Sequence, residues 1–121
     1  MLALKSILAG NDDIDTLIFD EIDTGISGIT ALKVAEKMSL ISENHQVICI
    51  SHLSQIAAMA DSHYLIEKKA DDNSTITSIK LLSYDERVDE LVRINSGFNK
   101  TDAAINQAKE MLESARNSKN K

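Results

Sequence analysis

Hydrophobic positions follow two patterns in the first half of the chain. Thr16–Phe19 and Val47–Ile50 are apolar runs without alternation, which is typical of strands buried on both faces of a parallel sheet. Between them, apolar residues recur at helical spacing: Ala31, Val34, Ala35, Met38 and Ile41. Residues 16–50 therefore predict a strand, a helix and a second, parallel strand.

The middle of the chain changes to shorter apolar segments. A short helix is predicted from Leu53 to about Ala60, with Leu53, Ile56, Ala57 and Ala60 on one side. Apolar and polar residues then mix over 63–68 and 75–82, around the polar segment 70–74. This arrangement predicts a β-hairpin.

Two further helices are predicted near the end. Ser83 and Glu86 have the spacing of a capping box, and Asn99 with Asp102 is our prediction for the next cap. The apolar face of the first helix comprises Val88, Leu91 and Val92, and that of the second comprises Ile105, Ala108, Met111, Leu112 and Ala115. Residues 117–121 are polar, so we expect a frayed tail. Residues 2–9 also predict a helix, ended by Gly10, with no capping residue before it.

Composition narrows the class of protein. The chain has 121 residues, 43% of them hydrophobic and 26% charged, which suits one globular domain. A net charge of −6 and only 3% aromatic residues argue against a grip on nucleic acid by this segment alone. The lone Cys49 allows no internal disulfide. With no apolar stretch of about 18 residues, we expect a cytoplasmic protein with no membrane partner.

Candidate chemistry follows the two apolar runs. Asp20 and Glu21 come directly after the first run, and His52 comes just after the second. The carboxyl ends of neighbouring parallel strands share one edge of a sheet, where ligands bind. One carboxylate there can hold Mg²⁺, its neighbour can orient water, and an imidazole can contact a terminal phosphate. The pattern predicts a nucleotide-hydrolysing site.

Two long motifs carry a family resemblance. Residues 16–28 read Thr-Leu-Ile-Phe-Asp-Glu-Ile-Asp-Thr-Gly-Ile-Ser-Gly, and residues 47–61 read Val-Ile-Cys-Ile-Ser-His-Leu-Ser-Gln-Ile-Ala-Ala-Met-Ala-Asp. Together they resemble the C-terminal part of the ATPase head of the RecN family, bacterial DNA double-strand-break repair proteins related to SMC and ABC ATPases. The resemblance is strong to about residue 67 and weaker at 86–91 and 108–112.

The resemblance implies a role for each matching residue. Asp20 would be the Walker B aspartate that positions Mg²⁺, Glu21 the catalytic carboxylate that polarises water, and His52 the switch histidine that senses the γ-phosphate of ATP. Ser27 stands in the loop that crosses a head dimer, where many ABC ATPases have aspartate. ATP and Mg²⁺ are the implied cofactors of the complete protein, with Asp20, Glu21, Ser27 and His52 as the nucleotide-binding residues.

Other expected motifs are absent from these 121 residues. No G-x-x-x-x-G-K-[ST] phosphate loop occurs, and the signature motif and coiled coil are missing too. The resemblance therefore implies an α/β fold that is part of an ABC/SMC-type P-loop ATPase head, with a C-terminal hairpin and helices. We expect residues 1–121 to be an inactive fragment of a bacterial cytoplasmic, nucleoid-associated protein. Its partners would be ATP, a second head and, through the complete protein, DNA in repair and recombination.

Two other function classes remain open. A metal-dependent phosphatase or nuclease could use Asp20, Glu21 and Asp23, although the spacing departs from the usual D-x-D at a strand end. A non-catalytic interaction module is the third reading, and the missing phosphate loop is its main support. A phosphatase assay with Mg²⁺ or Mn²⁺ would test the first alternative. Equilibrium ATP binding would separate a fragment of an ATPase from a complete enzyme.

Overall fold

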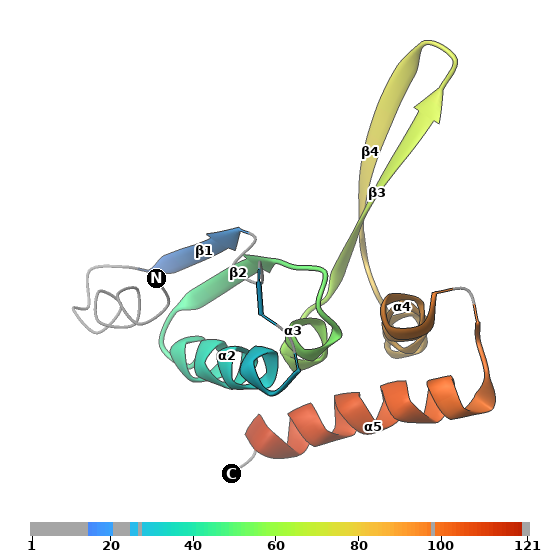
Figure 1. Cartoon of the computed structure of the whole chain (residues 1–121). Coiled ribbons are helices and arrows are strands. Elements are labelled where there is room, and N and C mark those ends of the chain that lie inside the picture. Colours follow the sequence, from blue (N-terminus) through green and yellow to red (C-terminus); the bar gives the residue numbers. More distant parts are fainter. Residues whose placement is uncertain (1–14, 21–24, 27, 98, 120–121) are drawn as a thin grey trace.

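A computed structural model describes residues 15–20, 25–26, 28–97 and 99–119 (Figure 1). The elements follow one another as β1 (Thr16–Asp20), α2 (Gly28–Ile41), β2 (Gln46–Ile50), α3 (Ser54–Met59), β3 (Tyr64–Asp71), β4 (Ser74–Leu81), α4 (Tyr84–Ser96) and α5 (Asp102–Lys119). The fold is therefore mixed α/β, as predicted. The predicted helix at 2–9 lies outside the described residues. Within them, no helix is both long and apolar enough to span a membrane.

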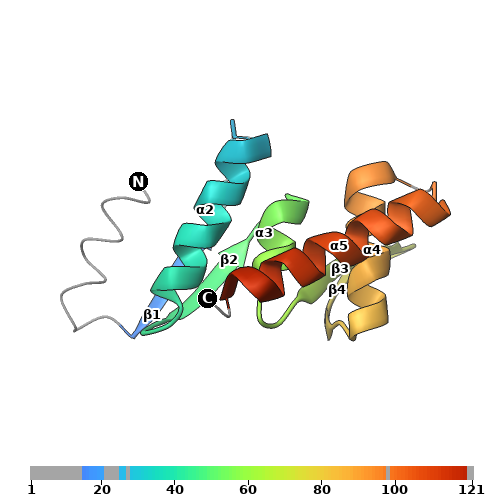
Figure 2. The ribbon, with the colours of Figure 1, turned by 90° about the horizontal axis from the view of Figure 1, so that it is seen from below.

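The two apolar runs form a parallel pair of strands. β1 pairs with β2 in a register that joins Ile18 to Ile48 and Asp20 to Ile50. Helix α2 lies across one face of this pair (Figures 1 and 2). Phe19 is fully buried on that face, in a small core with other apolar residues: Leu17, Met38 and Ile41. The predicted strand–helix–strand unit is confirmed.

The opposite face of the parallel pair is open in the described part of the chain. Ile18 is 60% exposed, Ile48 43% and Ile50 46%. Burial along β1 alternates residue by residue, because neighbouring side chains of a strand point to opposite faces and α2 covers only one of them. The prediction that both faces are buried is therefore wrong for this chain by itself.

Helix α3 lies at the centre of the main core. It packs against α2, α4 and α5. Helix α5 runs beneath α3 and α4 in Figure 1 and in front of them in Figure 2, which is seen from below. The buried residues of α3 are Ser54, Ile56, Ala58 and Met59. Our predicted face was partly wrong, because Leu53 and Ala60 flank the helix with extended backbone and only Ile56 of the predicted set is buried. A six-residue helix surrounded by three others buries more than one narrow stripe.

The predicted hairpin is present, with longer strands than expected. β3 and β4 pair from Tyr64↔Leu81 to Asp71↔Ser74, so the turn contains only Asp72 and Asn73. Asp71 accepts a hydrogen bond from the Asp72 N–H at 2.8 Å, and this local bond favours the turn. The hairpin projects away from the helices (Figure 1). None of its side chains is buried.

The last two helices have well-formed starts. The Ser83–Glu86 capping box is confirmed, with both reciprocal hydrogen bonds present. The second predicted cap is wrong: the Thr101 hydroxyl, rather than Asn99, accepts from the Ala104 N–H at 3.1 Å. Thr101 is correctly placed three residues before that donor, as an N-cap requires.

The predicted apolar faces of α4 and α5 are borne out by burial. Val88, Leu91 and Val92 are buried on α4. On α5, Ala108, Leu112 and Ala115 are buried, while Ile105 and Met111 pack at the margin of the core. Of the tail expected to be frayed, residues 117–119 are helical in α5, and the Lys119 ammonium group donates to Asp61 at 2.7 Å. Residues 120–121 lie outside the described residues.

Candidate functional site

The two strand ends named by the sequence lie side by side. β1 ends at Asp20, which is paired in register with Ile50, the last residue of β2. His52 follows two residues later. Asp20 and His52 are both exposed, so a ligand at this edge of the sheet can reach each of them. The predicted adjacency of the two strands is therefore confirmed, and it brings the carboxyl ends of both strands to one edge.

Other candidates belong to the segment after β1. Glu21 and Ser27 lie outside the described residues, so their predicted roles stay predictions. Gly25 and Gly28 have φ angles of 81° and 57°. This left-handed backbone is costly for residues with a side chain, and nothing lies within 4 Å of a Cβ added at either position. These glycines are therefore required for the path of the chain rather than for space.

A small turn shapes the backbone around His52. The Leu53 N–H donates to Ser51 Oγ at 3.1 Å. Leu53 then packs at the margin of the main core, and Ser54 is buried at the start of α3. His52 is thus exposed, while its neighbours Ser51 and Leu53 are fixed by this hydrogen bond and by packing. The backbone position of His52 therefore follows from that of α3.

Arg87 contacts the other end of α3. Its Nη2 atom lies 3.2, 3.4 and 2.9 Å from the carbonyl oxygens of Ala57, Ala58 and Ala60. Sequence reasoning gave Arg87 no role, because a contact between residues some thirty positions apart leaves no periodic signal. Its occurrence within a helix that begins with a capping box would have been the only hint.

A histidine lies in the same region. Burial, and then the positive charge of Arg87, lower the pKa of His63, against a smaller effect of Glu90. His63 Nδ1 and Arg87 Nε are buried without a hydrogen-bond partner in the described part of the chain. The half-buried position of His63 beside Arg87 favours a structural role for it.

The described residues can supply only a small part of the ligands of a Mg²⁺ ion. They contain no group of three or more His, Cys, Asp or Glu side chains that could hold a metal ion. Mg²⁺ at nucleotide sites is held by one or two carboxylates together with phosphate oxygens and water. Asp20, exposed at a strand end, fits that limited role.

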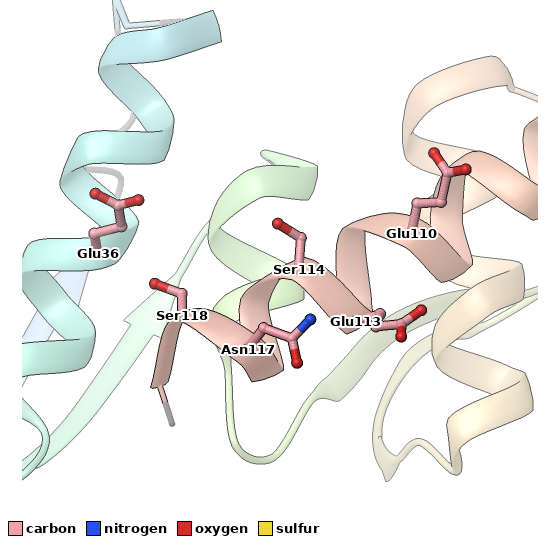
Figure 3. A pocket seen from close by; sticks show the side chains of 6 residues that line it. All are labelled: Glu36, Glu110, Glu113, Ser114, Asn117 and Ser118. Carbon is pink, nitrogen blue, oxygen red and sulfur yellow. The ribbon is translucent and has the colours of Figure 1, made fainter. Parts of the chain in front are cut away.

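A shallow depression lies elsewhere, between α2 and α5. Six polar residues line about 430 Å³ of open space: Glu36, Glu110, Glu113, Ser114, Asn117 and Ser118 (Figure 3). Glu36 extends from α2, and the other five belong to α5. Neither Asp20 nor His52 lines it, so it is separate from the candidate site. An open acidic surface of this kind is typical of solvated helix faces.

Comparison with known proteins gives consistent matches. The chain is 47% identical over 115 residues to the DNA repair protein RecN of Bacillus subtilis. It is 42% identical over 112 residues to that of Deinococcus radiodurans and 35% identical over 119 residues to that of Mycobacterium leprae. These matches cover 95%, 93% and 98% of this chain. The chain spans about a fifth of the length of each relative. No protein-family model matches it.

Proposed function

Because this chain is a segment of a RecN-family protein, we propose that the complete protein is an ATPase whose head domains dimerise during DNA double-strand-break repair and recombination. The chain contributes Asp20, Glu21 and His52 to the nucleotide site. One observation carries the proposal: Asp20 ends β1 and His52 lies two residues after β2, and the two strands are parallel neighbours paired in register. We place this work in the bacterial cytoplasm, at the chromosome, since the relatives are named for DNA repair.

Each residue would have a separate task. Asp20 would help to hold Mg²⁺, which neutralises charge on the phosphates when bound. Glu21 would orient and deprotonate the attacking water. His52 would donate a hydrogen bond to the terminal phosphate. The acidic pair stands at the end of β1 and the histidine comes after β2. The two strands must therefore stay paired with each other for the site to assemble.

Other parts of the complete protein would supply the remaining groups. The chain has no phosphate loop, and backbone N–H groups with a lysine normally provide much of the affinity for nucleotide phosphates. We therefore propose that residues 1–121 alone neither hydrolyse ATP nor bind it tightly. Ser27 would face the second head, and DNA would be bound outside this acidic segment. Calorimetry that gave micromolar ATP affinity for the isolated chain would contradict this part of the proposal.

Substitutions in the complete protein test the assignment of roles. Glu21→Gln keeps size and hydrogen-bonding reach but removes the base, so we expect turnover to fall by about 10²- to 10⁴-fold while ATP binding is retained. ATP-bound head dimers should then accumulate. Asp20→Asn should instead weaken Mg²⁺-dependent nucleotide binding, and His52→Ala should slow turnover with a smaller loss of binding.

A matched control is available just before the same strand. Asp15 precedes β1 and is exposed, as Asp20 is, but it stands at the opposite end. Asp15→Asn should therefore leave ATPase rates and nucleotide affinity unchanged. Near-normal turnover in Glu21→Gln would remove Glu21 from the catalytic role, and equal effects of Asp15→Asn and Asp20→Asn would remove Asp20 from the metal site.

A further inference from the structure

Helix α3 connects residues 51–53, which we call the His52 loop, to the rest of the core. It has six residues, and an isolated helix of that length is unstable because forming its first turn is costly. Its position must therefore come from tertiary contacts. Packing against α2, α4 and α5 supplies part of them, but apolar packing alone has little directional preference.

The contact from Arg87 is directional. One guanidinium nitrogen lies within hydrogen-bonding distance of the carbonyls of Ala57, Ala58 and Ala60. The last carbonyls of a helix lack partners within it and carry the negative end of the helix dipole. A planar, permanently charged donor on α4 therefore matches the C-terminal end of α3 in charge and geometry.

Keeping this guanidinium in place has an energetic cost. Burial lowers the pKa of Arg87, partly offset by the negative charge of Asp61, and Nε has no partner in the described part of the chain. A desolvated charge is retained only where other interactions compensate for it. At Arg87 the compensation comes from the carbonyls of Ala57 and Ala58 in α3 and of Ala60 just after it, together with the charge of Asp61.

We propose that Arg87 is a positioning residue for the His52 loop: by holding the C-terminal end of α3, it sets where the helix begins and hence where His52 lies. The N-terminal side is linked by the Leu53 N–H bond to Ser51 Oγ and by Leu53 packing. The importance for turnover rests on the proposed function of His52, but the placement of the loop can be tested without it.

Hydrogen exchange in the 121-residue chain tests the placement. Arg87→Ala should increase amide exchange at residues 51–60 by about tenfold or more, the effect expected when hydrogen bonds to a charged group are lost. Arg93→Ala is the control, because Arg93 pairs with Glu90 on its own helix and, in the described part of the chain, donates no hydrogen bond to α3. Equal changes at 51–60 in the two variants would overturn the proposal.

A conservative variant distinguishes a local effect on α3 from general unfolding of the chain. Arg87→Lys keeps the charge and most of the stem, but an ammonium group cannot reproduce the planar fork of donors. We expect intermediate exchange at 51–60, with β1 and α2 unchanged. Wild-type exchange in Arg87→Lys together with uniform loss of protection in Arg87→Ala would show a general stabilising role and overturn the proposal.

A double-mutant cycle in the complete protein tests the coupling to turnover. Arg87→Ala should lower kcat with KM for ATP nearly unchanged, and it should cause no further loss in a His52→Ala background. The same loss in both backgrounds would overturn the proposal. If His52→Ala alone left kcat unchanged, the proposed function of His52 would fail, and exchange at 51–60 would still decide the role of Arg87.

Discussion

The two sheets of this chain contain similar apolar residues in opposite surroundings. β1 and β2 lie on α2, and Phe19 of β1 is fully buried against that helix. β3 and β4 project from the body (Figure 1), and Ile79 remains 68% exposed. An isolated two-stranded hairpin is marginally stable in water, so this one depends on its base. There, the Leu82 N–H donates to the His63 carbonyl at 2.9 Å, and Leu82 is buried. The comparison teaches that contact with a helix, rather than strand composition, decides what a sheet contributes to stability.

The largest expected effect separates the two sheets directly. Phe19→Ala should lower the free energy of unfolding by about 3–5 kcal/mol, because it removes a fully buried aromatic side chain and leaves a cavity. Ile79→Ala in the hairpin should change it by only about 0.5 kcal/mol or less. Urea unfolding followed by circular dichroism measures both. Similar losses would mean that the hairpin is packed against something in solution.

The open face of the parallel pair should be visible in solution. Large exposed apolar side chains on a sheet favour association between molecules, so we expect the 13.3 kDa chain to self-associate. Ile48→Lys should shift it towards the monomer in sedimentation, because Ile48 lies in the middle of that face. Ile76→Lys on the hairpin is the matched control and should have a much smaller effect. A monodisperse wild-type monomer would contradict the prediction.

A smaller effect is expected where the hairpin meets α4. Ser83→Ala removes the hydroxyl that accepts from the Glu86 N–H and should cost about 1 kcal/mol of stability. Glu86 also pairs with Lys80 of β4, so the cap lies at the junction of both elements. Ser74→Ala, in an exposed part of the hairpin without a cap, should be nearly neutral. Equal stabilities of the two variants would show that the cap contributes nothing.

The smallest expected effect depends on pH. Because burial and Arg87 lower the pKa of His63 below its ordinary value of 6.5, the unfolded chain binds a proton more readily than the folded one. The folded state is therefore not penalised by His63 above pH 6.5. As the pH falls below 6.5 towards the lower pKa of folded His63, protonation favours the unfolded chain and the free energy of unfolding declines. His63→Gln should therefore lose less stability than the wild type between pH 7.5 and about 5.5. If His63→Gln and the wild type had the same pH dependence of stability, His63 would be excluded as its source.

Periodicity predicted most of the fold because burial imposes it. The faces of α2, α4 and α5 could be identified from apolar spacing, and the capping box at Ser83 from two residues. Strand ends could be located because Asp20 and His52 follow apolar runs. The face of α3 could not be predicted, since a six-residue helix among three neighbours has no single buried stripe.

For the candidate site, the residues near the strand ends could be predicted from the sequence, but the residue that contacts α3 could not. The sequence singled out Asp20 and His52 as candidates, and the two strands that precede or carry them are paired as predicted; their roles stay predictions. Arg87 could not be identified, because its contact with the carbonyls of α3 depends on how α4 packs, and tertiary packing is not encoded in local spacing. For the same reason, the open face of β1 and β2 could not be predicted. An apolar run without alternation does not indicate which helices cover each face of the strand.

The tip of the hairpin offers a practical handle. Asp72 and Asn73 form a two-residue turn at the far end of a ribbon whose side chains are all exposed or half-buried. Exposed tips of small polar residues tolerate insertions well. A fluorophore or a short affinity tag introduced between these residues would stand clear of α3 and the His52 loop (Figure 1). Energy transfer from a label there would report the approach of other protein segments without altering the residues under test.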